Sequence, residues 1–335
     1  MQVTLLSGFL GSGKTTLLNR VLKESAFADS AVIVNEFGDV GIDHRLIAAA
    51  RDVILLDSGC LCCRSGDSLA ETLLELYHRR SIGALPAFSR VLIETSGLAE
   101  PARITQVLLE NKLLAPLVSF SGVICIVDAL HGYSSLMQYV EAREQVAFAD
   151  RILFSKLDCC GEAVPAELDR LVKSLNPTAD ILTIPPLHVS PADLFHLERI
   201  GVWTAQQPVR HHEHTADIGS YSFRIQAAVT WAGIAAWTRH LTLRYGDDLL
   251  RCKALLRLCD GKGHVLIHGV RRTFVTTRHP DPSGGDSASP IVCIGRRLDR
   301  SALRPGLSWL NAPEGSEFPP SADFPPWEPI AIHEA

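Results

Sequence analysis

Short apolar runs alternate with longer amphipathic stretches over the first 200 residues of the chain. The first run starts at Gln2 and ends in a glycine-rich turn that opens a helix over about 14–24. Further runs lie at 31–35, 52–57, 90–95, 122–128, 149–158 and 181–184. Nearly continuous apolar strands separated by helices are typical of a parallel sheet covered on both faces. The pattern therefore predicts an α/β fold, a doubly wound and mostly parallel sheet over residues 1–200.

The pattern changes after residue 200. Residues 201–219 lose apolar periodicity and contain His211, His212 and His214, which predicts a linker whose histidines either capture metal or are simply solvated. From 220 to 310 a strand, an amphipathic helix over 231–245 and several alternating strands predict a smaller α+β domain. Residues 311–335 are rich in proline and glutamate, which predicts a flexible tail.

The amino-acid composition argues against several classes of protein. Of 335 residues, 47% are hydrophobic and 21% charged, which favours a folded protein, and the net charge of −5 disfavours nucleic-acid binding. We expect no membrane partner, because no apolar run is long enough to span a bilayer, and we expect a cytoplasmic location. Nine cysteines, three of them clustered, suit metal ligands in a reducing compartment better than disulfides.

The glycine-rich turn carries the most specific motif. Its residues match G-x-x-x-x-G-K-[ST] directly after a strand and at the start of a helix. Backbone N–H groups in such a turn surround phosphates, the lysine reaches the β and γ oxygens, and the threonine hydroxyl binds Mg²⁺. The predicted phosphate and Mg²⁺ residues are Gly8, Gly11, Ser12, Gly13, Lys14, Thr15 and Thr16.

Two further elements complete a nucleotide site. Glu94 lies at the end of the apolar strand at 90–95 and Gly97 follows two residues after it, where a carboxylate can hold Mg²⁺ through water and a glycine N–H can sense a γ-phosphate. The stretch 155–158 reads Ser-Lys-Leu-Asp, similar to the N-K-x-D motif that reads guanine. Asp158 would accept hydrogen bonds from guanine and Lys156 would cover its ring. Ser155 lacks the usual amide, so weaker binding is expected; the alternative is an ordinary strand end.

Cys60, Cys62 and Cys63 form a compact cluster after the strand at 52–57. Soft thiolates favour Zn²⁺ or Cu⁺, and three of them leave the shell incomplete, as a transferable metal needs. The missing ligand is left open between water, Asp39, another carboxylate and a group from a client protein. The alternative is that these are small buried residues. Packing explains most of the other six cysteines, and none of the six is assigned to the site. Asp128 is a secondary candidate at a strand end.

Five ordered motifs give the chain a family resemblance. GFLGSGKTTLLN, VNEFGDVGID, SGCLCC, ETSGLAEP and SKLD resemble the CobW-type GTPases, which are metal-trafficking P-loop proteins with a GCxCC signature. Later segments are similar to the C-terminal domain of that family. The resemblance implies a mobile switch over 36–41, a second switch at Glu94 and Gly97, metal binding at the three clustered cysteines, and GTP, Mg²⁺ and Zn²⁺ as ligands.

The function that follows is GTP hydrolysis to GDP and phosphate, coupled to transfer of zinc or another transition metal to a client protein. One alternative is a P-loop ATPase or small-molecule kinase with incidental cysteines. A second is a GTP-gated regulator whose metal is purely structural. Self-association through the helix over 231–245 stays open, as do the client and the physiological metal.

Overall fold

The computed structural model describes residues 1–34, 54–57, 67–161, 163–184, 192–195, 197, 218–261, 263–279, 289–316 and 332–333. The chain divides into two compact units. The first comprises Met1–Val172 and Ala179–Gly201, and the second Lys173–Thr178 and Val202–Ala335. The boundaries predicted at 200, 219 and 310 stay predictions.

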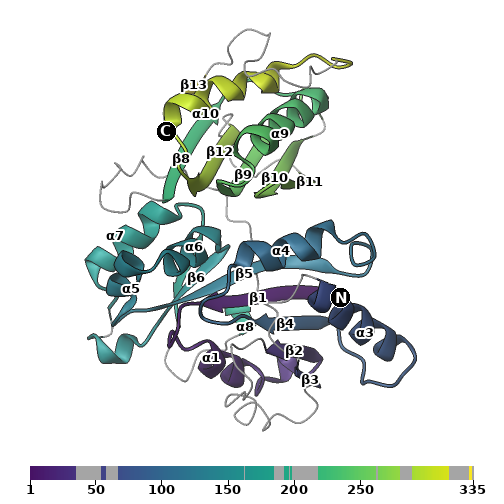
Figure 1. Ribbon diagram of the computed structural model, residues 1–335, viewed down its shortest axis with the longest axis vertical. Coiled ribbons are helices and arrows are strands. Elements are labelled where there is room, and N and C mark those ends of the chain that lie inside the picture. The colour runs from purple at the N-terminus through teal and green to yellow at the C-terminus, as the bar shows by residue number, and fades with distance from the viewer. Residues whose placement is uncertain are drawn as a thin grey trace. The chain divides into compact units, whose positions relative to one another are not determined.

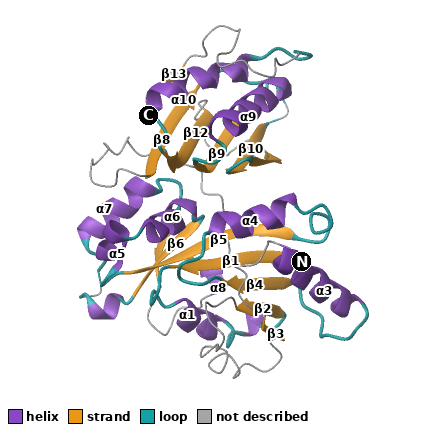
Figure 2. Cartoon of the chain, in the orientation of Figure 1, coloured by secondary structure: helices purple, strands orange, loops and turns teal. Residues whose placement is uncertain are grey.

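The first unit is built on a seven-stranded sheet whose paired strands are all parallel (Figures 1 and 2). The strand order is β3-β2-β4-β1-β5-β6-β7, so β1 lies at the centre. The strands are β1 (Gln2–Gly8), β2 (Ser30–Val34), β3 (Ile54–Asp57), β4 (Arg90–Glu94), β5 (Ser119–Asp128), β6 (Arg151–Ser155) and β7 (Asp180–Thr183). The predicted α/β fold class is confirmed.

Helices cover both faces of this sheet. α1 (Lys14–Val21) packs on one face and covers a core that includes Leu6, Ile124 and Ile126. α4 (Pro101–Glu110) and α6 (Val140–Phe148) lie over the other face (Figure 1). Successive strand residues point to opposite faces, so burial on both sides produces the uninterrupted apolar runs of the sequence. The remaining helices are α3 (Asp67–Ser81), α5 (Gly132–Gln138), α7 (Ala166–Leu175), α8 (Ala192–Phe195) and the 3₁₀ turns η1 (Ser25–Phe27) and η2 (Leu157–Cys159).

The second unit is an antiparallel sheet with helices. Its strand order is β11-β10-β9-β12-β8-β13, with β8 (Ile218–Ile225), β9 (Leu249–Arg257), β10 (His264–Val270), β11 (Thr273–His279), β12 (Ser289–Arg296) and β13 (Ile332–His333). The helices are α9 (Trp231–Tyr245), α10 (Arg300–Gly306) and the 3₁₀ turn η3 (Leu307–Asn311). Trp237 of α9 and Trp309 of η3 share a buried core with Phe223 and Ile267 of the sheet.

Several details differ from the expected elements. α1 ends at Val21 rather than near residue 24, because Lys23 and Glu24 close a turn on Arg20 and Val21 instead of continuing the helix. Within the predicted tail, Ile332 and His333 pair with β8. Among the described helices, none is long and apolar enough to cross a membrane.

A substitution at Leu5 tests how much the stability of the first unit depends on its central strand. The side chain of Leu5 is 0% exposed, so Leu5→Ala should lower the free energy of unfolding by about 2–5 kcal/mol through lost burial and a cavity. Urea unfolding followed by circular dichroism measures this change. Leu113→Ala is the matched control, because Leu113 is 67% exposed and its truncation should change stability by no more than about 0.5 kcal/mol. Equal effects of the two substitutions would contradict the packing described.

Candidate functional site

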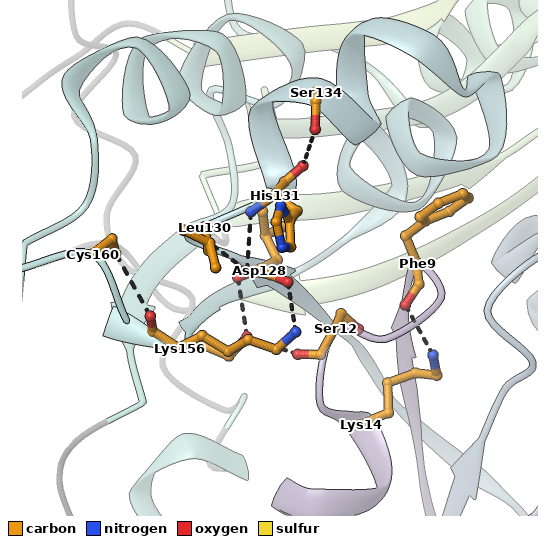
Figure 3. A network of polar contacts seen from close by, with 11 residues as sticks. Phe9, Ser12, Lys14, Asp128, Leu130, His131, Ser134, Lys156 and Cys160 are labelled. Carbon is orange, nitrogen blue, oxygen red and sulfur yellow. Dashed lines mark hydrogen bonds and ion pairs between the residues drawn. The ribbon is translucent and has the colours of Figure 1, made fainter. Parts of the chain in front are cut away.

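The turn between β1 and α1 forms a closed loop around the amine of Lys14. The Nζ atom of Lys14 donates to the carbonyl oxygens of Gly8 at 2.8 Å and Phe9 at 3.2 Å, so the ammonium lies across the turn (Figure 3). Gly13 precedes the helix with φ 96°, a left-handed conformation that glycine adopts without a steric penalty. The loop thereby presents a cation and a helix N-terminus at one place, which is an anion site.

A hydroxyl and a carboxylate meet beside this loop. The Oγ1 atom of Thr15 donates to Oε1 of Glu94 at 2.6 Å, although the two residues are 79 positions apart. Their meeting follows from the sheet, because β1 pairs with β4 and Leu6 lies opposite Glu94. Hard oxygen donors of this kind are the ligands that Mg²⁺ prefers. Thr16 and Gly11 of the same motif are exposed.

The segment after Glu94 packs directly on the phosphate loop. A Cβ atom at Gly97 would lie 2.8 Å from the backbone N and Cα atoms of Leu10, so a larger residue has no room there. On its other side, the carbonyl oxygens of Gly97 and Ala99 accept hydrogen bonds from the buried amide of Gln145 at 3.0 and 3.1 Å. Gly97 was predicted to belong to the site, whereas Gln145 was missed.

An ion pair lies on the far side of the loop. Nζ of Lys156 contacts Oδ2 of Asp128 at 2.7 Å, while Oδ1 accepts from the backbone N–H groups of Leu130 and His131 (Figure 3). Burial would raise the pKa of Asp128, but the hydrogen bonds from Lys156, His131 and Leu130 outweigh it and lower the pKa below its usual value. Asp128, only a secondary candidate in the sequence, thus holds the lysine of the base-reading motif.

Ser155 is tied to the phosphate loop. Its Oγ atom donates to the carbonyl oxygen of Ser12 at 2.7 Å and is buried. A hydroxyl therefore braces the loop despite the absent asparagine amide. Asp158, two residues beyond Lys156, is exposed at the surface and is accessible to a ligand.

A cavity of about 150 Å³ adjoins these groups. Phe9, Asp128, His131, Gln145 and Lys156 are among its lining residues. Cys125 also lines it, and burial raises the pKa of that thiol to about 12, against the lowering effect of Lys14. Cys125 is therefore a neutral thiol at physiological pH, which agrees with its assignment to packing.

The predicted metal ligands belong to segments next to the described strands. Cys60, Cys62, Cys63 and Asp39, the switch over 36–41, and His211, His212 and His214 lie outside the described residues. Among the residues that are described, no group of three or more His, Cys, Asp and Glu side chains could hold a metal ion. The strand preceding the cysteines is described, however, and Asp57 at its end lies opposite Val34, which in turn lies opposite Glu94.

Comparisons with known proteins cover both units. Residues 2–183 match the family model of the CobW/HypB/UreG nucleotide-binding domain, and residues 218–310 match that of the cobalamin synthesis protein cobW C-terminal domain. The zinc chaperone YjiA of Escherichia coli is 33% identical over 92% of this chain and 98% of its own length. The zinc chaperone CobW of Pseudomonas aeruginosa is 29% identical over 90% of this chain and 89% of its own.

A solved structure is similar over nearly the same length. The crystal structure of the Zn(II)-bound YjiA GTPase from Escherichia coli has a TM-score of 0.72 at 28% identity, covering 92% of this chain and 98% of that one. The similarity thus extends over both units, each with its own sheet.

The ion pair of Asp128 predicts a pH-dependent contribution to stability. Asp128→Asn keeps an acceptor for the two backbone N–H groups but removes the charge, and it should cost about 1 kcal/mol at pH 7, since Lys156 is partly exposed to screening solvent. Because the pKa of Asp128 is lowered on folding, the stabilisation is complete above the unfolded carboxyl value of about 3.9 and is lost as the pH falls through the folded pKa.

Urea unfolding of both proteins between pH 7 and pH 3 measures this difference. Glu71→Gln, at an exposed position inside α3, is the control and should match the unsubstituted chain throughout. The ion pair would be contradicted if the difference in the free energy of unfolding between Asp128→Asn and the unsubstituted chain stayed constant down to pH 3.

Proposed function

Since the chain belongs to the CobW family of P-loop GTPases, with both of its domains matched, we propose that it hydrolyses GTP and uses the nucleotide cycle to control zinc held by its cysteine cluster. The family resemblance predicted from the five motifs is confirmed. Relatives named as zinc chaperones, and a relative solved as a Zn(II)-bound GTPase, support zinc as the metal and GTP as the nucleotide. Zinc is cargo in this function, released to a client protein.

The phosphate groups of GTP suit the turn around Lys14. Its ammonium, already directed across the turn, would contact the β and γ oxygens, and the N–H groups of the first turn of α1 would face the same charge. Thr15 and Glu94 would hold Mg²⁺, which neutralises charge on the phosphate oxygens when bound. Gly97 would offer its N–H to the γ-phosphate, a contact that the GDP state lacks.

The guanine base suits the exposed carboxylate of Asp158. Guanine presents an N1–H and a 2-amino group on one edge, and a carboxylate can accept from both, whereas adenine would leave it unpaired. Lys156 is kept beside the loop by Asp128, and Ser155 fixes the loop through Ser12. These contacts favour a GTPase over the alternative of an ATPase or small-molecule kinase.

One observation carries the link to metal: the strand that leads to the cysteines ends in the same row of the sheet as Glu94. Asp57, Val34 and Glu94 are successive register partners across β3, β2 and β4, so Asp57 and Glu94 are two strand spacings, about 10 Å, apart. Three peptide units join Asp57 to Cys60, and a segment of that length spans at most about 10 Å. The segment that carries the cysteines therefore leaves the sheet at the same edge as Glu94, which supports our proposal that the cysteines lie near the Mg²⁺ and γ-phosphate positions.

This proximity supports coupling between nucleotide and zinc. Cys60, Cys62 and Cys63 would bind zinc with an incomplete shell, and Asp39 or a client residue would supply a further ligand. A γ-phosphate that orders the loops around it would change the geometry of a neighbouring metal shell, which is how an order–disorder switch couples two ligands. A reducing compartment such as the cytoplasm would keep the thiols available.

Zinc titration in each nucleotide state tests the coupling. The zinc dissociation constant should differ by about 5- to 150-fold between the GDP-loaded protein and the protein loaded with a non-hydrolysable GTP analogue. Cys62→Ser should weaken zinc binding on the order of a hundredfold by removing one thiolate. Cys259→Ser, at an exposed cysteine outside the cluster and outside the nucleotide site, is the control and should leave zinc affinity unchanged.

Equal zinc affinity in the empty, GDP-loaded and GTP-analogue-loaded states would refute the delivery function. If chelators also unfolded the protein, the metal would be structural and the chain a GTP-gated regulator.

Exchange of Asp158 for asparagine tests which base the site reads. Xanthine carries a carbonyl where guanine carries the 2-amino group, and the amide of an asparagine at position 158 can donate to that carbonyl. Asp158→Asn should therefore lose GTP affinity by about 10-fold or more and gain affinity for XTP. Competition binding with GTP, XTP and ATP measures both changes, and Glu71→Gln serves as the surface control. ATP displacing GTP from the unsubstituted chain at equal concentration would instead favour the ATPase or kinase alternative.

A further inference from the structure

Gln145 is a buried amide whose two donors serve one loop. Its side chain is 0% exposed within α6, and Nε2 donates to the carbonyl oxygens of Gly97 and Ala99. A primary amide has two N–H groups, so both are used on this segment. An apolar side chain would fill the same space more cheaply, because burial of an amide costs free energy that only its hydrogen bonds recover.

The loop held by this amide has little freedom of its own to move. Gly97 is pressed against the backbone of Leu10 on one side and is fixed by Gln145 on the other. Holding the carbonyl oxygen of Gly97 fixes the plane of the peptide that joins Gly97 to Leu98. The N–H of Gly97 belongs to the preceding peptide, so it is restrained through the torsions of Gly97 itself. The contact therefore acts one peptide unit away from the N–H that the proposed function assigns to the γ-phosphate.

The helix that carries Gln145 also contacts the phosphate loop. Tyr139, at the start of α6, stacks on Phe9 with ring centroids 4.7 Å apart. Two residues after α6 the chain enters β6, which ends at Ser155 beside Ser12. One continuous segment thus contacts the phosphate loop at two points and the loop after β4 at a third.

We propose that Gln145 is a positioning residue that pre-organises the Gly97–Ala99 loop for the γ-phosphate and so sets the preference of the protein for GTP over GDP. This inference rests on the proposed GTPase function. Gln145 itself touches no nucleotide. Without the two hydrogen bonds from Gln145, the γ-phosphate would have to order the loop. The entropic cost of that ordering would make the free energy of GTP binding less favourable and would leave that of GDP binding unchanged.

Two substitutions of similar size separate positioning from packing. Gln145→Met removes both donors, and it should weaken binding of a non-hydrolysable GTP analogue by about tenfold, with GDP affinity changed less than about twofold, and lower kcat. Gln145→Glu places a carboxyl against two carbonyl oxygens, and burial there raises the pKa of that carboxyl. Its protonated form can donate once, so analogue affinity relative to the unsubstituted chain should recover as the pH falls from 8.5 to 6.

Val172→Ala is the control for a general loss of stability. Val172 is 0% exposed in α7. Its truncation should lower the melting temperature without changing the ratio of GDP to analogue affinity. Fluorescent nucleotide titration, steady-state hydrolysis and thermal unfolding are measured on all four full-length proteins.

The outcomes distinguish this inference from the function it rests on. If Gln145→Met weakened GDP and analogue binding equally, Gln145 would have a packing role. The same would follow if the relative analogue affinity of Gln145→Glu did not change with pH. Either result would overturn the positioning role alone. An unsubstituted chain that binds and hydrolyses no GTP would overturn the proposed function, and the positioning role with it.

Discussion

The position of β1 between β4 and β5 is the constraint on which the candidate site depends. All three strands run parallel, so their carboxyl ends lie at one edge of the sheet. The phosphate loop leaves β1 at this edge, Glu94 ends β4 there, and Asp128 ends β5 on the other side. Ligands of open α/β sheets bind at this edge because only there do loops from several strands converge. Thr15 and Glu94 meet for this reason.

The polar residues of α6 form the second part of the architecture. Arg143 and Gln145 are both buried in a helix that also buries Val146 and Phe148. Arg143 donates to the carbonyl oxygen of Leu136 at the end of α5, and Gln145 donates to the loop after β4. Buried polar groups are usually paired. The donors named here bond to backbone carbonyls, whereas Oε1 of Gln145 has no hydrogen-bond partner among the described residues. The helix therefore fixes the path of two neighbouring segments as well as filling the core.

These two features show what the sequence could and could not predict. Parallel strands buried on both faces leave long apolar runs, so the order of elements in the first unit and the phosphate loop were predictable from periodicity and one motif. Gln145 was not, because a backbone carbonyl can belong to any residue and leaves no complementary signal in the sequence. The end of α1 at Val21 and the pairing of Ile332 with β8 depend on tertiary contacts. The cysteine ligands stay a prediction from motif and resemblance.

Ser155 shows how the separate parts of the site communicate. An amide at this position would offer two donors, whereas the hydroxyl has one and gives it to the carbonyl oxygen of Ser12. A displacement of the phosphate loop must therefore break or carry with it a buried bond to the end of β6, from which Lys156 and Asp158 follow. On the opposite side, the same loop meets Glu94, which shares a row of the sheet with Asp57. The base-reading segment, the phosphate loop and Glu94 are thus joined by short contacts at one edge of the sheet, and the strand that leads to the cysteine segment ends at the same edge, so the proposed coupling between nucleotide and metal needs no long-range pathway.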